Sequence, residues 1–259
     1  MIRQLRHLIE RRQLIWYLTK SNLKVTYKNK ALGYLWSLLD PLMMMLVYVV
    51  LVQVIFKRGE PLFPILLFSA LLAWRWFLQT IQQSTLSIAS KEKLVQTVGF
   101  PRIVLPAQHI LTGLVKYGLS LGVLAPLLLV FRVPLTIHIL WLPLIVLCQL
   151  VLTFGVAVYC SVVGVYFRDL QNILVFGLRL VFYLSPALYS IGDRVPERLQ
   201  TLYLVLNPFA ALFNGYKNAL VRGEPPLLYL GIVLALGLAL SLSSLAVFDK
   251  YEDRLAKDV

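Results

Sequence analysis

The chain has little of what catalytic and metal-binding sites need. Its 259 residues include 12 Asp and Glu, three His and two Cys, against 25 Lys and Arg. No Gly-Lys dipeptide occurs, which excludes a Walker A loop, because that loop needs a lysine directly after a glycine. Both cysteines, Cys148 and Cys160, fall in one apolar stretch, where we expect free thiols. The sequence therefore predicts no enzyme, no nucleotide site, no metal site and no cofactor within this chain.

Apolar sequence is what the chain has in abundance. It is 59% hydrophobic with a mean hydropathy of +0.77, whereas soluble domains are usually about 45–50% apolar. Stretches long enough to cross a bilayer of roughly 30 Å as helices occur at about residues 35–56, 62–81, 105–131, 139–166, 173–189 and 227–248. We therefore expect an all-α integral membrane protein with six transmembrane helices.

The N-terminal segment is basic, and its apolar residues recur near helical spacing. Eight Lys and Arg fall within residues 1–34, and Leu5, Leu8, Ile9, Ile15 and Trp16 lie near helical spacing. This pattern favours an amphipathic helix in the membrane interface over a plain polar lead-in. The first apolar run is too long for the core of a cleaved signal peptide. The sequence thus predicts a cytoplasmic interface segment (1–34), a six-helix membrane domain (35–248) and a short cytoplasmic tail (249–259).

The distribution of basic residues predicts the orientation. Lys and Arg accumulate on cytoplasmic loops, and placing both termini inside gives the cytoplasm 15 of them and the outside seven. The net charge of +13 then faces anionic lipid, and no nucleic-acid partner is needed to explain it.

Two loops are unusual. Residues 90–106 form the largest predicted cytoplasmic loop, a polar helix and turn closed by Pro101 and Pro106. Residues 185–226, on the outside, are too apolar for a solvated loop and are cut by prolines. We expect two short helices there, near 197–206 and 209–221, that re-enter the outer leaflet. Such backbone survives at that depth only against protein or a wet cavity.

Charges within the predicted spans are mostly basic. Arg75, Lys116 and Arg179 lie inside spans, and Asp40 is the only acid that does, near the expected cytoplasmic start of the first. A lone cation at mid-bilayer costs about 2.5–3.5 kcal/mol. The long side chain of Arg179 can extend to the membrane interface, whereas Arg75 and Lys116 lie too near the middle of their spans to do so. We expect them to face a wet cavity that accepts anions. The many aromatic residues serve either interfacial belts and packing or a lining for sugar rings.

Several local strings resemble one transporter family. Residues 23–28 (LKVTYK) and 32–41 (LGYLWSLLDP), then Phe100-Pro101-Arg102, Phe167-Arg168-Asp169-Leu170, Ser185-Pro186 and Asn207-Pro208-Phe209 resemble, in that order, the motifs of type-2 ABC permeases that export polysaccharides and polyol phosphates. The match covers nearly the whole chain. Thr26 stands where the family often has Arg, and Trp74-Arg75-Trp76 departs from a mainly apolar second span.

The resemblance implies a half-transporter. Two copies would form a homodimeric channel, and two copies of a separate ATPase, which bind ATP and Mg, would drive it. The substrate would be a lipid-linked polysaccharide, such as O-antigen or a teichoic-acid-like polymer, crossing the bacterial plasma (inner) membrane among membrane lipids. A permease of the same fold for capsule polysaccharide, drugs or lipids is the alternative. A membrane-embedded enzyme of lipid-linked sugar metabolism is disfavoured, because His7, His109 and His138 are scattered.

Three groups of site residues follow from the resemblance and from the intramembrane charges. Contact with the ATPase is expected at Lys91, Glu92, Lys93, Phe100, Pro101 and Arg102. The substrate channel and its entrance are expected at Arg75, Lys116, Arg179, Trp74, Trp76, Tyr27 and Tyr34. An external gate is expected at Tyr203, Asn207, Pro208, Phe209 and Phe213.

Overall fold

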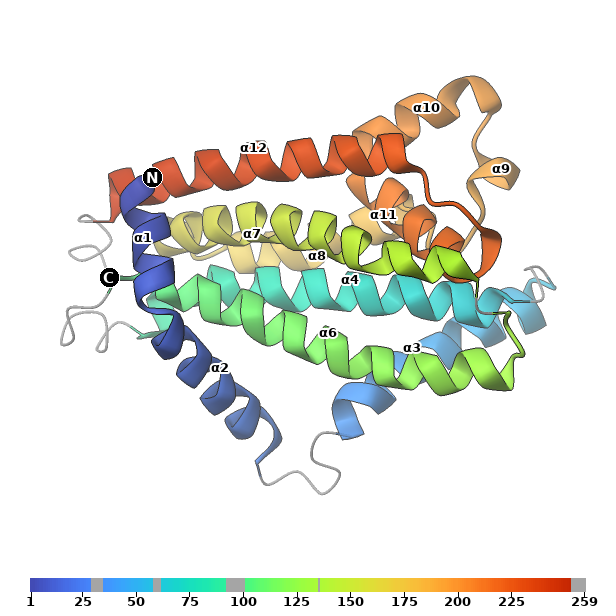
Figure 1. Ribbon diagram of the computed structural model, residues 1–259, viewed down its shortest axis with the longest axis horizontal. Coiled ribbons are helices and arrows are strands. Elements are labelled where there is room, and N and C mark those ends of the chain that lie inside the picture. Colours follow the sequence, from blue (N-terminus) through green and yellow to red (C-terminus); the bar gives the residue numbers. More distant parts are fainter. Residues whose placement is uncertain (29–34, 58–61, 92–100, 135, 253–259) are drawn as a thin grey trace.

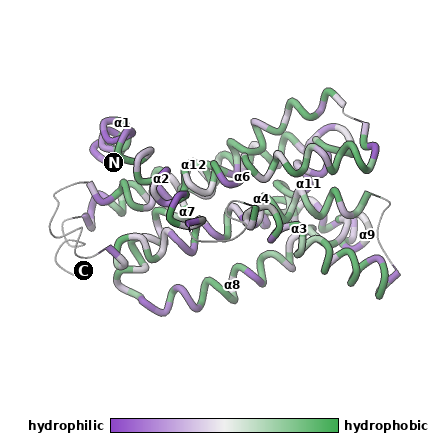
Figure 2. Tube along the Cα trace, turned by 90° about the horizontal axis from the view of Figure 1, so that it is seen from below, coloured by the Kyte–Doolittle hydropathy of each residue, from purple (hydrophilic) through white to green (hydrophobic). Residues whose placement is uncertain are grey.

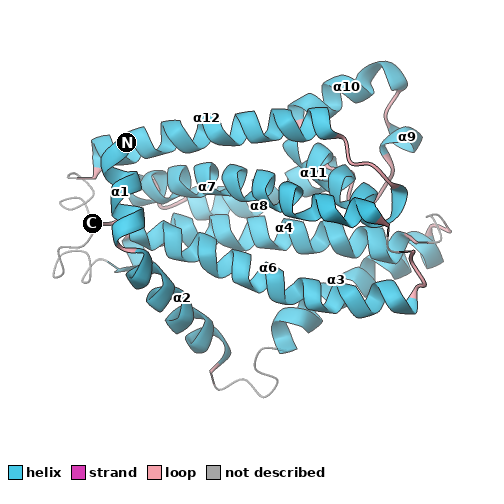
Figure 3. Ribbon diagram, viewed as in Figure 1, coloured by secondary structure: helices cyan, strands magenta, loops and turns pink. Residues whose placement is uncertain are grey.

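The protein is helical throughout the part of the chain that the structure describes. The computed structural model describes residues 1–28, 35–57, 62–91, 101–134 and 136–252, and no strand occurs among them (Figure 3). The helices are α1 (Ile2–Glu10), α2 (Arg12–Tyr27), α3 (Trp36–Val49), η2 (Val50–Ile55), α4 (Phe63–Thr85), η3 (Ala89–Lys91), α6 (Val104–Val130), η4 (Ile137–Trp141), α7 (Leu142–Tyr166), α8 (Leu170–Leu184), α9 (Ile191–Arg194), α10 (Glu197–Leu206), α11 (Pro208–Lys217), η5 (Asn218–Arg222) and α12 (Leu227–Tyr251).

Four of the helical segments are long and apolar enough to cross a membrane. They are Phe63–Thr85, Val104–Val130, Ile137–Tyr166 and Leu227–Tyr251, and two shorter apolar helices cover Leu39–Ile55 and Leu170–Leu184. The long helices lie lengthwise, with the N-terminal helix at one end of the bundle and α9, α10 and part of α11 toward the other (Figure 1). Polar sequence gathers near the end that holds α1 (Figure 2). This architecture is that of an integral membrane protein.

Helix α4 is the centre of the bundle. In its most apolar window 83% of the residues are buried within the protein, against 28% in that of α6. Ile65, Leu67 and Phe68 on α4 have no exposed surface. Because α4 packs on α3, α6, α7, α8 and α11, a side chain on any of its faces meets a neighbouring helix.

Small residues let α7 and α12 approach closely. A Cβ atom on Gly155 would lie 2.8 Å from backbone atoms of α12, and one on Gly237 would lie 2.8 Å from the backbone nitrogen of Leu152. Ser241 adds a hydrogen bond of 2.9 Å from its hydroxyl to the carbonyl of Val151. Close backbone contact at small residues is the usual means of joining helices in lipid.

The short helices between α8 and α12 occur where the sequence predicts them. Helix α10 spans the predicted residues 197–206, and α11 with η5 covers 208–222. Helix α8 ends at Leu184, before the expected end of its apolar stretch at Tyr189. Ser185 has an extended backbone with ψ of 150°, as expected for a residue that precedes a proline.

The N-terminal segment forms two helices, α1 and α2, and α1 is tied to the end of α12. Gln4, which is fully buried, donates from Nε2 to Asp249 Oδ1 at 2.9 Å and to Glu252 Oε2 at 2.8 Å. Arg3 bonds both carboxylates at 3.0 and 2.6 Å. Ile2 and Ile9 of α1 are exposed while Leu8 packs inward, and the place of this segment in the membrane interface stays a prediction.

Candidate functional site

A cavity of about 260 Å³ opens between the end of α2, the start of α3, and the middles of α4 and α6. Its lining carries charge of both signs and several amides. The polar side chains that line it are those of Thr26, Asp40, Arg75, Gln79, Gln82, Gln83, Lys116, Tyr117 and Ser120. A cavity with these groups at the depth of mid-helix α4 is suited to a polar ligand and not to a lipid tail.

A second cavity, of about 470 Å³, lies between α3, α4 and α8. Arg75, Gln79 and Gln82 line this cavity as well as the first, so the two adjoin along one face of α4. Arg179 lines the second cavity, and Lys116 lines the first. The structure therefore places all three predicted intramembrane cations around two adjoining cavities, with Arg75 common to both.

Arg75 has an acidic partner, so it is not the lone cation that the sequence suggested. Its Nη2 donates to Oδ2 of Asp40 on α3. We expected Asp40 near the cytoplasmic side of the first span. In the structure α2 runs obliquely away from the bundle and α3 begins beside the middle of α4 (Figure 1), and the ion pair shows that Asp40, one turn into α3, lies level with Arg75.

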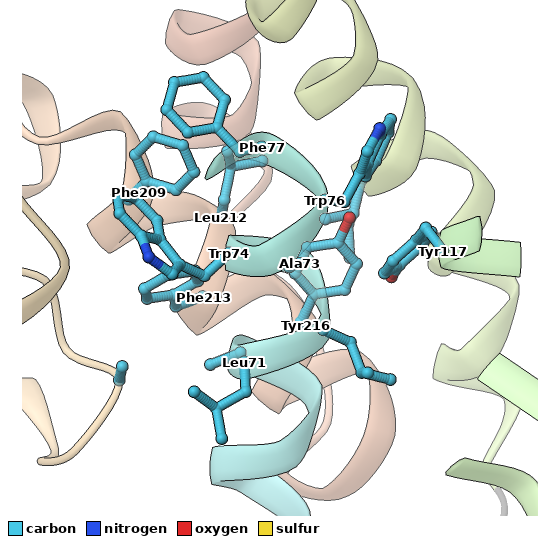
Figure 4. Packing of buried hydrophobic residues seen from close by; sticks show 14 of the residues in the cluster. Leu71, Ala73, Trp74, Trp76, Phe77, Tyr117, Phe209, Leu212, Phe213 and Tyr216 are labelled. Carbon is cyan, nitrogen blue, oxygen red and sulfur yellow. The ribbon is translucent and has the colours of Figure 1, made fainter. Parts of the chain in front are cut away.

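Aromatic side chains occupy both sides of α4 (Figure 4). On one side Trp74 packs edge-on against Phe209, with ring centroids 4.9 Å apart. On the other side Trp76 stacks on Tyr117 of α6 at 4.9 Å with an interplanar angle of 24°. Trp74 lines the second cavity and Trp76 the first, yet the two indoles are only 5% and 3% exposed. Packing is thus their visible role, and contact with sugar rings stays a prediction.

The predicted external gate residues divide into two groups. Phe209 and Phe213 are buried beside Trp74 in the core of the protein. Tyr203 instead lies near the surface, where its hydroxyl is 2.8 Å from that of Tyr189 and also donates to the carbonyl of Leu184. The aromatic pair therefore anchors α11, while Tyr203 holds α10 against the end of α8.

The Asn207-Pro208 motif forms the N-terminal cap of helix α11. The side-chain oxygen of Asn207 accepts from the backbone N–H groups of Phe209 and Ala210 at 3.0 and 3.2 Å, and Pro208 occupies the first turn, where no N–H is needed. The side-chain amide donates to the carbonyl of Leu184 at 3.3 Å. One residue thus starts α11 and joins it to the end of α8.

The predicted ATPase contact is only partly described. Lys91 ends η3 and is half-buried, and this burial lowers the pKa of its ammonium group. Arg102 donates from Nη1 to the backbone carbonyl of Glu252, so the residues after the loop are tied to the end of α12, and Pro101 adjoins this contact. Glu92, Lys93 and Phe100, like Tyr34 of the predicted channel, lie outside the described residues, as does the side chain of Tyr27.

Sequence reasoning missed the amides in the cavities. Gln79, Gln82 and Gln83 follow Arg75 by four, seven and eight residues, the spacing of one helix face. Polar residues in that pattern on an apolar helix are a signal that the sequence contained. Asp40 was noted in the sequence, but its pairing depends on where α3 begins.

Comparison with known proteins agrees with this architecture. Residues 13–221 match the family model described as ABC-2 type transporter. The chain belongs to the ABC-2 type transporter family. Relatives include a protein of Myxococcus xanthus named O-antigen export system permease protein RfbA, which is 32% identical over the full length of both chains. A Klebsiella pneumoniae protein of the same name is 28% identical over 94% of each chain. This membership is why the sequence motifs occur in the expected order.

Proposed function

We propose that this ABC-2 family member is the membrane subunit of an ATP-driven exporter that moves a lipid-linked polysaccharide, such as O-antigen, across the bacterial plasma (inner) membrane. Relatives aligned over nearly the whole chain carry the name of O-antigen export permeases. The structural observation that supports the proposal best is the convergence of Arg75, Lys116 and Arg179 on two adjoining cavities lined by amides.

The chemistry of these cavities suits an anionic lipid-linked sugar. Arginine binds phosphate through paired, charge-assisted hydrogen bonds, and the amides of Gln79 and Gln82 both donate and accept, as sugar hydroxyls require. We assign Arg75 and Lys116 to the diphosphate end of the substrate as it enters from the cytoplasmic side. Arg179 in the second cavity then meets the anion further along the path.

Energy must come from a partner ATPase that binds ATP and Mg. The loop between α4 and α6 is its docking element in this proposal, with Lys91, Pro101 and Arg102 at its described edges. Because Arg102 bonds to the end of α12, a push on this loop would reach α12 and, through Asp249, also α1. The ATPase subunits would then move the cytoplasmic end of the bundle together.

Two copies of the chain would form the channel. Helix α8 is loosely covered: Ile173, Phe176 and Leu180 are 53%, 70% and 60% exposed. Helix α3 exposes Met43 and Val47. Other residues of both helices line the second cavity, so a homodimer joined through α3 and α8 would place the cavities of both copies along a shared path.

We propose six membrane passes with both termini in the cytoplasm. The two shorter apolar helices, Leu39–Ile55 and Leu170–Leu184, would complete the four long spans, and α10 and α11 would re-enter the outer leaflet. Residues 1–34 would lie in the cytoplasmic interface, 35–248 in the membrane and 249–259 in the cytoplasm.

Export assays on point variants test the proposal. Arg75→Ala and Lys116→Ala should each lower the amount of polysaccharide at the cell surface by at least tenfold, with the protein still inserted. Arg198→Ala, which removes an exposed cation on α10 that lines neither cavity, is the control. Wild-type export by both cavity variants would refute the assignment. Unchanged surface polysaccharide after depletion, together with altered drug sensitivity, would favour the alternative, a drug or lipid exporter.

A further inference from the structure

The ion pair between Arg75 and Asp40 extends the proposed function, on which the following inference rests. The guanidinium group assigned to the substrate anion is already bonded to a carboxylate of the same chain. Asp40 belongs to the lining of the first cavity, and Arg75 belongs to both. The carboxylate therefore holds Arg75 from the side at which the substrate would enter.

The two partners of this pair differ in exposure. The side chain of Asp40 is 52% exposed, and that of Arg75 is 23% exposed. Asp40 lines the polar first cavity and is the more exposed of the two, so its carboxylate is more readily hydrated after separation than the guanidinium of Arg75, which is costly to leave unpaired among apolar helices. Asp40 is thus the partner that can leave, provided that another anion takes its place on Arg75.

The pair is also a polar tie between the first turn of α3 and the middle of α4. Leu42, Met45 and Val49 pack on the core through apolar contacts. Further along α3, the hydroxyl of Tyr48 lies 3.3 Å from that of Tyr183 on α8. Loss of the ion pair would therefore loosen the first turn of α3 against α4, while the apolar contacts and the hydroxyl of Tyr48 keep the rest of the helix attached.

We infer that Asp40 is a resident anion that occupies Arg75 until a phosphate-bearing substrate displaces it. A ligand at Arg75 must compete with this carboxylate, so a neutral or weakly anionic lipid is rejected. A diphosphate offers more charge and more acceptor oxygens than a carboxylate, and its binding selects the state in which Asp40 has left Arg75. Asp40 thereby determines specificity for the charged end of the substrate.

Binding of inorganic pyrophosphate to the full-length protein, purified with its ATPase partner, tests this inference. Asp40→Asn removes the competitor and should bind pyrophosphate about ten times more tightly than wild type, a gain of about 1.4 kcal/mol. It should also have a lower Tm without pyrophosphate, which pyrophosphate restores. Glu224→Gln also replaces a carboxylate with an amide, but at an exposed position outside the cavities, and should match wild type in both measurements.

A cysteine variant allows the charge to be restored after folding. Asp40→Cys treated with a neutral methylthio reagent should keep the tight pyrophosphate binding, whereas a sulfonatoethyl adduct should return it to the wild-type affinity. Wild-type protein treated in parallel controls for reaction at Cys148 and Cys160.

The outcomes separate this inference from the proposed function. If Asp40→Asn binds pyrophosphate no more tightly than wild type, or cannot be recovered even with pyrophosphate present, Asp40 is not an exchangeable anion. The proposed function still stands in that case if Arg75→Ala loses both pyrophosphate binding and export. If Arg75→Ala binds pyrophosphate as wild type does, the inference fails, and the proposed assignment fails with it if Arg75→Ala and Lys116→Ala both export as wild type does.

Discussion

Gly113 on α6 and Trp76 on α4 approach so closely that a Cβ atom on Gly113 would lie 2.8 Å from Cδ1 of the indole and 2.3 Å from Oγ1 of Thr80. The contact holds the face of Trp76 against Tyr117 and forms one wall of the first cavity. Only a residue without a side chain allows the two helices this separation.

Gly113→Ala should therefore destabilise the protein by about 1–3 kcal/mol, because the added methyl group forces α4 and α6 apart. Unfolding in detergent, followed by tryptophan fluorescence, measures the change. Gly118→Ala is a matched control on the same helix, since nothing lies within 4 Å of its Cβ position. Equal stability of the two variants would contradict the close approach.

Asn207 should contribute to stability in two separable ways. Asn207→Ala removes the cap of α11 and the bonds to Leu184 and Ser185, and should cost about 1–2 kcal/mol. Asn207→Asp keeps the acceptor for the cap but loses the amide donor, so it should cost less. Equilibrium unfolding of both variants gives the comparison. If Asn207→Asp lost as much stability as Asn207→Ala, the cap itself would contribute little.

Gln4 should hold α1 on the bundle. Its amide donates to two carboxylates, on Asp249 and Glu252, in a buried position, and such bonds are worth about 1.5–3 kcal/mol each when a charged acceptor is involved. Gln4→Ala should expose the chain around Arg11 and speed its cleavage by trypsin. Gln13→Ala, at an exposed position on α2, should leave cleavage unchanged. Equal cleavage rates in these two variants would exclude the role.

Cysteine labelling checks the orientation. Thr201 on α10 is exposed, as is Lys24 on α2. In intact cells Thr201→Cys should react with a membrane-impermeant maleimide, while Lys24→Cys should react only after permeabilisation. The reverse pattern would place the termini outside and overturn the proposed topology.

Local pattern was enough to predict most of the helices. Long apolar runs must become helices in lipid, because no water satisfies their backbone groups. The predicted bounds of α10 agree with the structure because Pro196 precedes its first turn and Asn207 follows its last residue, Leu206. These signals act over a few residues, so the sequence displays them directly.

The candidate site was predictable in its residues but not in its pairing. Arg75, Lys116 and Arg179 stood out because charge is costly in a membrane. The partnership of Arg75 with Asp40 depends on the depth at which α3 begins, which the oblique course of α2 decides. Likewise, the burial of Phe209 and Phe213 beside Trp74 depends on how α11 packs against α4, and their place at an external gate stays a prediction.

By itself, the amino-acid sequence determined that this protein is a helical membrane protein with a basic N-terminal segment and cations within its apolar helices, because the bilayer acts on each segment separately. Only the tertiary structure decided which cations share a cavity, which acid neutralises Arg75 and which aromatics are buried. Those outcomes depend on how far each helix is shifted along its neighbour, and that shift is set by contacts between residues distant in the chain.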